Sequence, residues 1–411
     1  MNSVKRILWI SDYFPRPHDT TLGVWGLESV KAIIRKGIEV IVFSPTPWLP
    51  KLLFFTSRLR KLNQVPLKYT FNSVNIFYPR CPHYPHRLVI KYIYNYFPYF
   101  ETSFLIRWLN PVLKEIVQNY SFDAVHSNFI FPGGYIGYAI KNQYNVPFVV
   151  HERSVKRMSD ALQHKLRKEL YSKIINEADA VISPSRKIAG TIEQLLGNNK
   201  KVKVVRDPGS HSTLNTTEIF QLKPEKYRNK KIILSVGSLI ERKGHEYLIK
   251  AVNILKEEFE NIICIIIGSG VRKRYLDKLV KSLNLNSYIE MAGKLPHDEV
   301  LKFMSWCSIF VLPSWDEAFG TVYGEAMAFG KPVIACKNEG LSEMIENGIH
   351  GFLVNKRDEG DIASAVKKIL TDDMLEASMG SASKILVEKN LNYDFMASEI
   401  VDLYNSIAAG K

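Results

Sequence analysis

Two basic side chains stand beside glycines in the C-terminal half of the chain, where they could bind an anionic ligand. Arg242 and Lys243 belong to the segment VGSLIERKG, from Val236 to Gly244, between a predicted strand and a predicted helix. Backbone N–H groups at the start of a helix attract anions, and adjacent cations strengthen that attraction. The segment therefore predicts a phosphate-binding loop, and the simpler alternative is that both cations only contact solvent.

Two glutamates, Glu317 and Glu325, lie eight residues apart in the segment PSWDEAFGTVYGEAMAFGKP. Glu317 is predicted in a loop after a strand, and Glu325 in a helix beginning near Phe319 or Gly320. At about 1.5 Å per helical residue the two would be about 12 Å apart, which suits the two ends of one elongated ligand. Gly320 permits close backbone approach, so the N–H groups after it could bind an oxyanion. Such a site could hold hydroxyl groups and a phosphate together.

Length and composition exclude several classes of protein. The chain has 411 residues, whereas single hydrophobic cores stop growing near about 250–300 residues, so two domains are expected. Hydrophobic residues make up 46% and charged residues 23%, as in ordinary globular proteins. The four cysteines stand singly, without C-x-x-C spacing, and no D-x-D triplet occurs. We therefore expect neither a disulfide framework nor a zinc site.

Apolar periodicity predicts two successive sets of alternating strands and helices. In the first half, strands are predicted at 7–10, 40–43, 123–126, 147–150 and 179–182, and helices at 24–36 and 133–144. In the second half, strands are predicted at 231–236, 262–267, 289–291 and 309–312, and helices at 245–258, 272–283 and 298–306. This alternation is typical of parallel sheets covered by helices on both faces.

The predicted fold class is therefore α/β, with two doubly wound, Rossmann-like domains in tandem. The expected domains are 1–210 and 211–390, with a C-terminal helix in 391–411 packing back on the N-terminal domain; the polar run 223–231 is the candidate linker. Ligands bind beyond the carboxyl ends of the strands in such sheets. We therefore expect the active site in the cleft between the domains.

These residues carry a resemblance to a known family. The run EAFGTVYGE, followed by AMAFGKPVIA and EMIENGIHGFLV, resembles the E-x7-E region of the family-4 glycosyltransferases, which are retaining nucleotide-sugar enzymes with the two-domain GT-B fold. VGSLIERKG resembles their donor-phosphate loop. In the first half, PHDTTLGVWGLESVKAIIRKGIEVIVFSP resembles their glycine loop and first helix, and FVVHERS their strand-end histidine. The resemblance covers most of the chain.

The resemblance implies a role for each residue of the site. Arg242 and Lys243 would bind the donor diphosphate and neutralise the leaving group. Glu317 would hold the transferred sugar, and Glu325 the ribose hydroxyls. His151 would approach the sugar from the other domain, and its alternative is a hydrogen-bonded strand-end histidine. Further donor contacts are implied for Gly23, Phe319, Gly320, Thr321 and Val322.

The resemblance also implies the reaction, a hexosyl transfer with retention at the anomeric carbon, without a metal and without a cofactor. The departing phosphate oxygen would accept the acceptor's proton on the same face. Two departures stand out: Ser238 replaces a frequent arginine, and the sequence DPGS at 207–210 replaces an Asn-Gly turn. A nucleotide-sugar epimerase or hydrolase and a non-catalytic partner subunit are the alternatives. The glutamate spacing disfavours the first, and the presence of all four charged side chains disfavours the second.

The positive charge is concentrated in the first half. The formal net charge is +14, and residues 1–215 contain 30 Lys and Arg against 14 Asp and Glu. Between Lys51 and Phe100 there are eight basic residues and no acidic one. Such a stretch favours nucleic acid, anionic lipid or a phosphorylated substrate, or else it is a solvated surface. The chain lacks a recognisable nucleic-acid-reading motif, so no nucleic acid is expected as a partner.

Two segments of this half are candidates for membrane contact. Residues 48–62 place leucines and phenylalanines at helical spacing between basic residues, and could lie flat on a bilayer. Residues 87–109 contain Tyr92, Tyr94, Tyr96, Phe97, Tyr99, Phe100 and Trp108, which are of types favoured at membrane interfaces, with core packing as the alternative.

No apolar stretch reaches about 18–20 residues, and no cleavable signal peptide is recognisable. We therefore expect a cytoplasmic enzyme, peripheral on the inner face of the cytoplasmic membrane. Its acceptor would be a glycan or a lipid-linked molecule in cell-surface polysaccharide or glycolipid synthesis.

Overall fold

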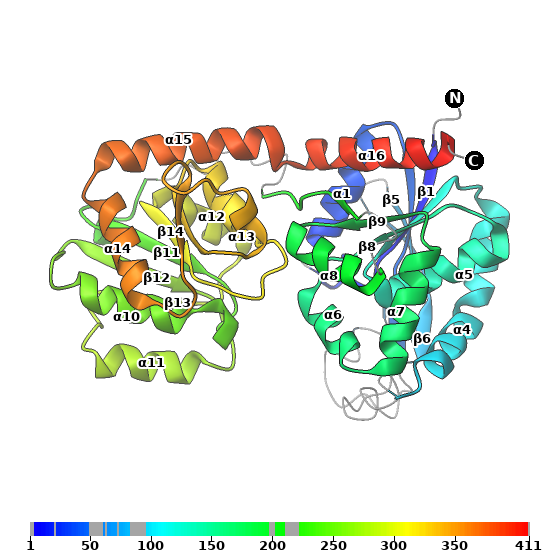
Figure 1. Ribbon diagram of the computed structural model, residues 1–411, viewed down its shortest axis with the longest axis horizontal. Helices are drawn as coiled ribbons and strands as arrows, with labels where there is room; N and C mark the ends of the chain where they lie inside the picture. The colour runs from blue at the N-terminus through cyan, green and yellow to red at the C-terminus, as the bar shows by residue number, and fades with distance from the viewer. Residues whose placement is uncertain are drawn as a thin grey trace. The chain divides into compact units, whose positions relative to one another are not determined.

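The chain forms two compact units, each with its own hydrophobic core. The computed structural model describes residues 4–19, 22–48, 61, 64–71, 74–82, 96–196, 202–209 and 222–409. Unit 1 consists of Met1–Val205 and Met396–Lys411, and unit 2 of Arg206–Phe395 (Figure 1). The predicted α/β class is confirmed, because each unit is a mainly parallel sheet covered by helices.

Unit 1 is built on a sheet whose described strands follow the order β10-β9-β8-β7-β1-β2-β5-β4. Neighbouring strands are parallel, except that β4 runs antiparallel to β5 at the edge. The strands are β1 (Arg6–Ile10), β2 (Glu39–Phe43), β4 (Lys68–Phe71), β5 (Val74–Phe77), β7 (Ala124–Asn128), β8 (Phe148–His151), β9 (Ala180–Ser183) and β10 (Lys203–Val204). A separate parallel pair is formed by β3 (Thr46–Trp48) and β6 (Arg80–Pro82).

Helices connect these strands. They are α1 (Val24–Arg35), α4 (Pro98–Asn119), α5 (Tyr135–Tyr144), α6 (Val155–Leu162), α7 (Lys165–Glu177) and α8 (Arg186–Leu196). The predicted helix at 133–144 begins later, at Tyr135. The cause is a π-turn, η2 (Ile130–Gly134), in which Phe131 has extended backbone angles.

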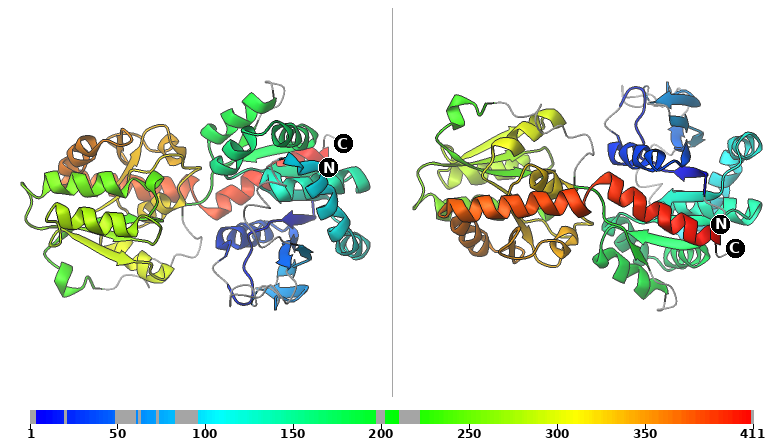
Figure 2. Two further views of the ribbon diagram at one scale, coloured as in Figure 1. Left: turned by 90° about the horizontal axis from the view of Figure 1, so that it is seen from below. Right: turned by 90° about the horizontal axis from the view of Figure 1, so that it is seen from above.

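The last helix, α16 (Tyr393–Ala409), belongs to unit 1 from Met396 onward. Figure 2 shows it in red along unit 1, between the blue first elements and the green later ones. Val4 N donates to Asn405 Oδ1 at 3.1 Å, and Tyr404 Oη lies 2.7 Å from His126 Nδ1. Through these contacts the end of the chain is hydrogen-bonded to the segment just before β1 and to β7.

Unit 2 is built on a sheet of six described strands, all parallel, in the order β13-β12-β11-β14-β15-β16. They are β11 (Lys231–Val236), β12 (Ile262–Ile267), β13 (Ile289–Gly293), β14 (Ile309–Leu312), β15 (Val333–Cys336) and β16 (Gly351–Val354). In chain order this is the 3-2-1-4-5-6 arrangement of a dinucleotide-binding sheet. The helices are α10 (His245–Leu255), α11 (Lys273–Ser282), α12 (His297–Trp306), α13 (Thr321–Ala328), α14 (Glu359–Leu370) and α15 (Asp373–Asn390).

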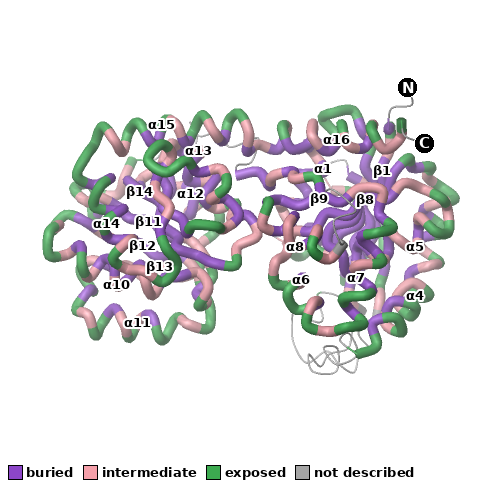
Figure 3. Tube along the Cα trace, in the orientation of Figure 1, coloured by how far each residue is buried: buried purple, intermediate pink, exposed green. Residues whose placement is uncertain are grey.

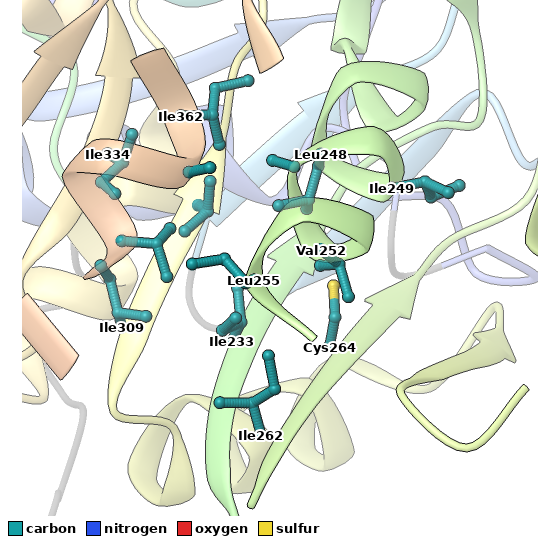
Figure 4. Close-up of a cluster of buried hydrophobic side chains, with 14 of the residues drawn as sticks. Ile233, Leu248, Ile249, Val252, Leu255, Ile262, Cys264, Ile309, Ile334 and Ile362 are labelled. Carbon is teal, nitrogen blue, oxygen red and sulfur yellow. The ribbon is translucent and has the colours of Figure 1, made fainter. Parts of the chain in front are cut away.

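Alternate residues of the unit 2 strands face opposite layers of helices. Ile233 packs in a cluster with α10, α11 and α14 (Figure 4), whereas Ile232 and Leu234 pack with α12, α13 and α15. Because both faces are covered, β14 and β15 are buried throughout, and β11 and β12 are buried over most of their length (Figure 3). This explains the unbroken apolar runs that predicted β11, β12 and β14.

The run 223–231 does not behave as a linker. It belongs to unit 2, where η3 (Glu225–Tyr227) buries Tyr227 against the sheet, and Lys231 opens β11. The division between the units falls earlier, between Val205 and Arg206. The linker prediction was therefore wrong, because one aromatic ring anchors this polar segment to the core.

The predicted membrane-contact segments are only partly described. Residues 49–60, 62, Tyr92 and Tyr94 lie outside the described residues. Tyr96, Phe97, Tyr99, Phe100 and Trp108, in and just before α4, have exposed side chains, so the core-packing alternative does not hold for them. Across the described ranges, no helix combines the length and the apolar content that crossing a bilayer requires.

Candidate active site

The strand order of unit 2 reverses between β11 and β14, so the loops that follow these strands diverge from a common point. Open α/β sheets bind ligands at such a switch point. The loop after β11 carries Arg242 and Lys243, and the loop after β14 carries Glu317. The topology thus brings together the cations and one carboxylate that the sequence placed 74 residues apart.

Gly244 explains how the cationic loop is held. Residues Glu241–Lys243 form a short 3-10 turn, η4, and Gly244 follows with φ 71°, the left-handed region that favours glycine. A Cβ atom here would lie 2.1 Å from the carbonyl oxygen of Pro313. In addition, Trp315 N donates to Arg242 O at 2.8 Å. The loops after β11 and β14 therefore pack backbone against backbone.

Glu317 is the centre of the site. Its Oε2 atom lies 2.6 Å from Lys243 Nζ and 3.3 Å from Arg242 Nη1. The side chains of Glu317 and Lys243 are only 14% and 13% exposed, which strengthens their attraction relative to a surface pair. Asp316, just before it, has φ 54°, a conformation that is uncommon for a residue other than glycine. The carboxylate is thus held on both cations by a constrained loop.

The helix that follows begins at Thr321, one or two residues after the predicted start. Gly320 is its N-cap with φ 90°, and the first N–H groups of a helix have no intrahelical acceptor. Phe319 is only 2% exposed and packs in the core with α12 and α15. Its side chain therefore anchors the loop, and any donor contact of this residue is left to its backbone.

Glu325 lies on α13 and pairs with a residue that sequence reasoning had not singled out. Its Oε1 atom is 3.4 Å from Nε2 of His297, the first residue of α12. The Glu325 carboxylate raises the pKa of His297 above its ordinary value, against the opposing effect of burial. Glu325 therefore pairs with His297, whereas Glu317 pairs with Lys243 and Arg242, and these are two separate polar centres within unit 2.

Gly23 and His151 belong to unit 1. Gly23 caps α1 with φ 66°, and a Cβ atom there would lie 2.4 Å from Tyr13 O. His151 ends β8 and is fully buried. Arg153 links the two regions, because its Nη2 atom lies 3.2 Å from His151 Nδ1 and its guanidinium lies 4.6 Å from the centre of the Trp25 ring in α1.

The surroundings of His151 keep its ring neutral. Burial lowers its pKa well below the ordinary value, and the neighbouring Arg153 and His126 lower it further. Its Nε2 atom is buried and has no hydrogen-bond partner among the described residues. Of the two ring nitrogens, Nδ1 is therefore hydrogen-bonded and Nε2 is not, within the described part of the chain.

Sequence reasoning missed two further residues at the unit 2 site. Glu339 Oε2 accepts a hydrogen bond from Glu317 N at 2.9 Å, and so holds the loop that carries the central carboxylate. His245 lies beside Lys243, with its Nδ1 atom 3.3 Å from Ser235 Oγ, and burial lowers its pKa to about 4. His245 could have been singled out because it directly follows Gly244 at the end of the cationic loop. No local sequence pattern points to Glu339.

The two departures from the family pattern are also visible. Ser238 is exposed in the loop after β11, where a larger cation would have room. Gly209 belongs to unit 2, donates from its N to Leu391 O at 2.8 Å and packs closely on Gly324 of α13. Within the described ranges, no group of His, Cys, Asp or Glu is arranged to hold a metal ion.

Two family models match the chain, one over most of each unit. The family model described as Glycosyltransferase Family 4 matches residues 27–207, and the one described as Glycosyl transferases group 1 matches residues 216–385. A D-inositol 3-phosphate glycosyltransferase from Corynebacterium jeikeium is 27% identical over 284 residues, which cover 64% of this chain and 67% of that protein.

Solved structures share the fold over nearly the whole chain. Sucrose-phosphate synthase from Thermosynechococcus elongatus has a TM-score of 0.75 at 19% identity, covering 99% of this chain and 100% of that one. Anabaena Alr3699/HepE in complex with UDP-glucose has a TM-score of 0.68 at 17% identity, covering 98% and 99%. Two adjoining family matches, one for each unit, and this shared architecture show that the chain belongs to the family-4 glycosyltransferases of the GT-B fold.

Proposed function

We propose that this glycosyltransferase moves a hexosyl group from a nucleoside-diphosphate sugar to an acceptor hydroxyl, with retention at the anomeric carbon. The observation that carries the proposal is the convergence of Lys243 and Arg242 on Glu317 Oε2, at 2.6 and 3.3 Å. Two cations beside a carboxylate can bind both groups of a sugar diphosphate. The cations bind the phosphates, and the carboxylate accepts hydrogen bonds from the sugar hydroxyls.

Donor binding would exchange one anion for another. The diphosphate would replace the Glu317 carboxylate on Arg242 and Lys243, and Glu317 would then be free to accept hydrogen bonds from the sugar. The N-terminus of α13, after Gly320, adds positive potential for the diphosphate. Glu325 would bind the ribose hydroxyls. The UDP-glucose complex of Anabaena Alr3699/HepE supports a donor of this class.

The same cations would lower the barrier to transfer. As the bond between the anomeric carbon and the phosphate oxygen breaks, negative charge grows on the diphosphate, and fixed cations stabilise that charge more than the ground state. The acceptor oxygen would bond to the anomeric carbon on the same face, and its proton would pass to the departing phosphate oxygen. Side-chain cations would thus provide the charge that a metal ion supplies elsewhere.

The acceptor would be a glycan or a lipid-linked molecule at a membrane surface. The name of the Corynebacterium relative indicates a hydroxyl-rich, phosphorylated acceptor for that enzyme, which is consistent with an anionic acceptor here. Support for a membrane surface comes from exposed aromatic side chains at α4, of which Phe100 is 66% and Phe97 53% exposed. Tyr96 packs edge-on against His164, just before α7, whose Lys165 and Lys168 are exposed. Aromatic and basic side chains together suit an anionic bilayer.

One experiment tests the function. The protein is incubated with a panel of nucleoside-diphosphate sugars, with and without membrane extract, and released nucleotide and labelled lipid are followed. Nucleotide release that depends on the extract, together with labelled lipid, supports the proposal, and an α-linked product from an α-donor supports retention. Conversion of donor without extract would instead identify an epimerase or hydrolase, and nucleotide binding without any turnover would identify a partner subunit.

A further inference from the structure

His151 is held by a neighbour that can only donate hydrogen bonds. Arg153 Nη2 lies 3.2 Å from His151 Nδ1, and a guanidinium has no acceptor atom. The Nδ1 atom must therefore present its lone pair to Arg153. Arg153 is itself fixed, since its guanidinium lies over the ring of Trp25 at 4.6 Å, a geometry of cation–π attraction.

A neutral imidazole with an unprotonated Nδ1 carries its proton on Nε2. His151 is neutral because it is fully buried and lies next to the positive charge of Arg153. The groups that face it from the neighbouring elements do not reverse this, since His126 of β7 is also buried and its Nδ1 atom is bound to Tyr404 of α16. Within the described part of the chain, the charged and titratable groups that act on the His151 ring are Arg153 and His126, and neither is a carboxylate.

We propose that Arg153 fixes His151 as the Nε2–H tautomer, so that His151 serves the substrate as a hydrogen-bond donor and takes no proton from the acceptor. The Nε2 atom is buried and has no hydrogen-bond partner among the described residues, so its N–H group stays unpaired until an oxygen atom comes within reach. Arg153 is then a positioning residue, acting through His151. This inference rests on the proposed function for the identity of the substrate oxygen, whereas the tautomer itself does not depend on it.

Tautomers of histidine can be read directly from the nitrogen resonances of the ring. The full-length protein would be labelled with ¹⁵N-histidine in a deuterated background, and the His151 signals assigned by their loss in His151→Gln. We expect a protonated Nε2 and an unprotonated Nδ1 from pH 8 to pH 5.5, without titration. A protonated Nδ1 at neutral pH, or titration of His151 within this range, would overturn the inference whether or not the enzyme transfers sugar.

The role of Arg153 is tested by Arg153→Met, which is expected to mix the two tautomers, while burial still keeps the pKa of His151 below its ordinary value. Arg153→Lys retains a donor and should retain the Nε2–H form. Arg272→Met is the matched control, because Arg272 also stacks on an aromatic ring, that of Tyr275, but lies in unit 2. His151 signals that are unchanged in Arg153→Met would contradict the assignment of Arg153.

Turnover distinguishes a donor from a base. A glutamine amide can place an N–H donor near the position of Nε2 but cannot act as a base, whereas leucine does neither. We therefore expect kcat/KM of His151→Gln to stay within about tenfold of wild type, and that of His151→Leu to fall by about a hundredfold or more, as for loss of a donor to developing charge. Equal losses in the two variants would refute the donor role.

Discussion

The Nζ atom of Lys243 lies 2.6 Å from Oε2 of Glu317, so the carboxylate proposed to hold the sugar rests on a cation proposed to hold the diphosphate. Arg242 contacts the same oxygen at 3.3 Å. The carboxylate thus offsets one of the two positive charges, and a diphosphate would have to displace it from both cations. This relationship separates the contribution of Glu317 to affinity from its contribution to turnover.

Glu317→Ala should abolish transfer while sparing nucleotide affinity. Removing the carboxylate frees Lys243 and Arg242 for phosphate, so we expect the affinity for a nucleoside diphosphate to be unchanged or up to about tenfold higher, a gain of about 1.4 kcal/mol. Turnover should fall by about 10³-fold, because contacts that orient the sugar are lost. Calorimetric titration with nucleotide and a turnover assay measure the two effects.

Lys243→Ala is the matched comparison, since it should weaken both nucleotide binding and turnover. Glu317→Gln keeps the size of the side chain and removes its charge, and should resemble Glu317→Ala in affinity. Full activity in Glu317→Ala would refute the role of the carboxylate. A loss of nucleotide affinity as large as that in Lys243→Ala would show that Glu317 supports the loop instead.

Much of the unit 2 site could be predicted from the sequence, because Arg242, Lys243 and Glu317 lie in short loops. Each loop directly follows a strand that its apolar residues make easy to recognise. The loops after β11 and β14 were recognisable from Gly244 and Gly320, whose positive φ angles leave little choice of residue. The contact between Lys243 and Glu317 follows from the strand order, which brings the two loops to one switch point. That their charges pair directly in the absence of ligand was not predictable from either segment.

Contacts between residues that are far apart in the chain could not be predicted from the sequence. Nothing local indicates that Tyr404 would reach His126, since the two are 278 residues apart and the contact depends on α16 joining unit 1. Glu339 likewise has no distinguishing local pattern, and its role depends on the fold, which brings its side chain to the backbone N–H of Glu317. The run 223–231 was mistaken for a linker because its charges outnumber its apolar residues, although Tyr227 alone is enough to anchor it.

The pairing of His297 with Glu325 predicts a pH-dependent contribution to stability. The pKa of His297 is raised in the folded state, so the contribution is complete below the unfolded pKa of about 6.5 and is lost as pH rises through the folded pKa. We expect His297→Gln to be less stable than wild type by under about 1 kcal/mol at pH 5.5, since the side chain is 46% exposed, and to match it at pH 8.5. Urea unfolding at both pH values measures the difference.

His350 provides a control of opposite sign. Its Nδ1 atom accepts a hydrogen bond from Glu346 N, and burial lowers its pKa, so its contribution is present above about pH 6.5 and lost as pH falls. His350→Ala should therefore show its larger deficit at pH 8.5. A deficit of His297→Gln that is equal at the two pH values would contradict a charged pair with Glu325.

Gly324 should not tolerate a side chain. A Cβ atom at this position of α13 would lie 2.2 Å from Gly209 Cα, and backbone atoms cannot yield cheaply. We expect Gly324→Ala to destabilise unit 2 by about 1–3 kcal/mol and to weaken nucleotide binding, because α13 also carries Glu325.

Gly360→Ala in α14 is the control. The nearest atom to a Cβ at Gly360 would be Asp358 Oδ1 at 3.5 Å, so alanine should be neutral or stabilising by up to about 1 kcal/mol. The melting temperatures of the two variants are measured by thermal unfolding. Equal changes in melting temperature for Gly324→Ala and Gly360→Ala would argue against the close contact between Gly324 and Gly209.

The exposed aromatics at α4 predict binding to anionic bilayers. Phe100 and Trp108 are 66% and 45% exposed, and insertion of such rings at the interface adds to the attraction of Lys165 and Lys168 for lipid charge. We expect the wild-type protein to float with vesicles that contain anionic lipid, and to do so less in high salt, because salt screens the charge.

The variant that replaces both Phe100 and Trp108 with serine should lose at least about tenfold in the vesicle-bound fraction while keeping its fold by circular dichroism. A matched variant with Val271→Ser and Met374→Ser removes two apolar side chains that are 90% and 83% exposed in unit 2, and should bind as wild type does. Binding that is indifferent to lipid charge would remove the electrostatic argument. Equal losses in the two double variants would show that any exposed apolar pair suffices, and that α4 has no special role.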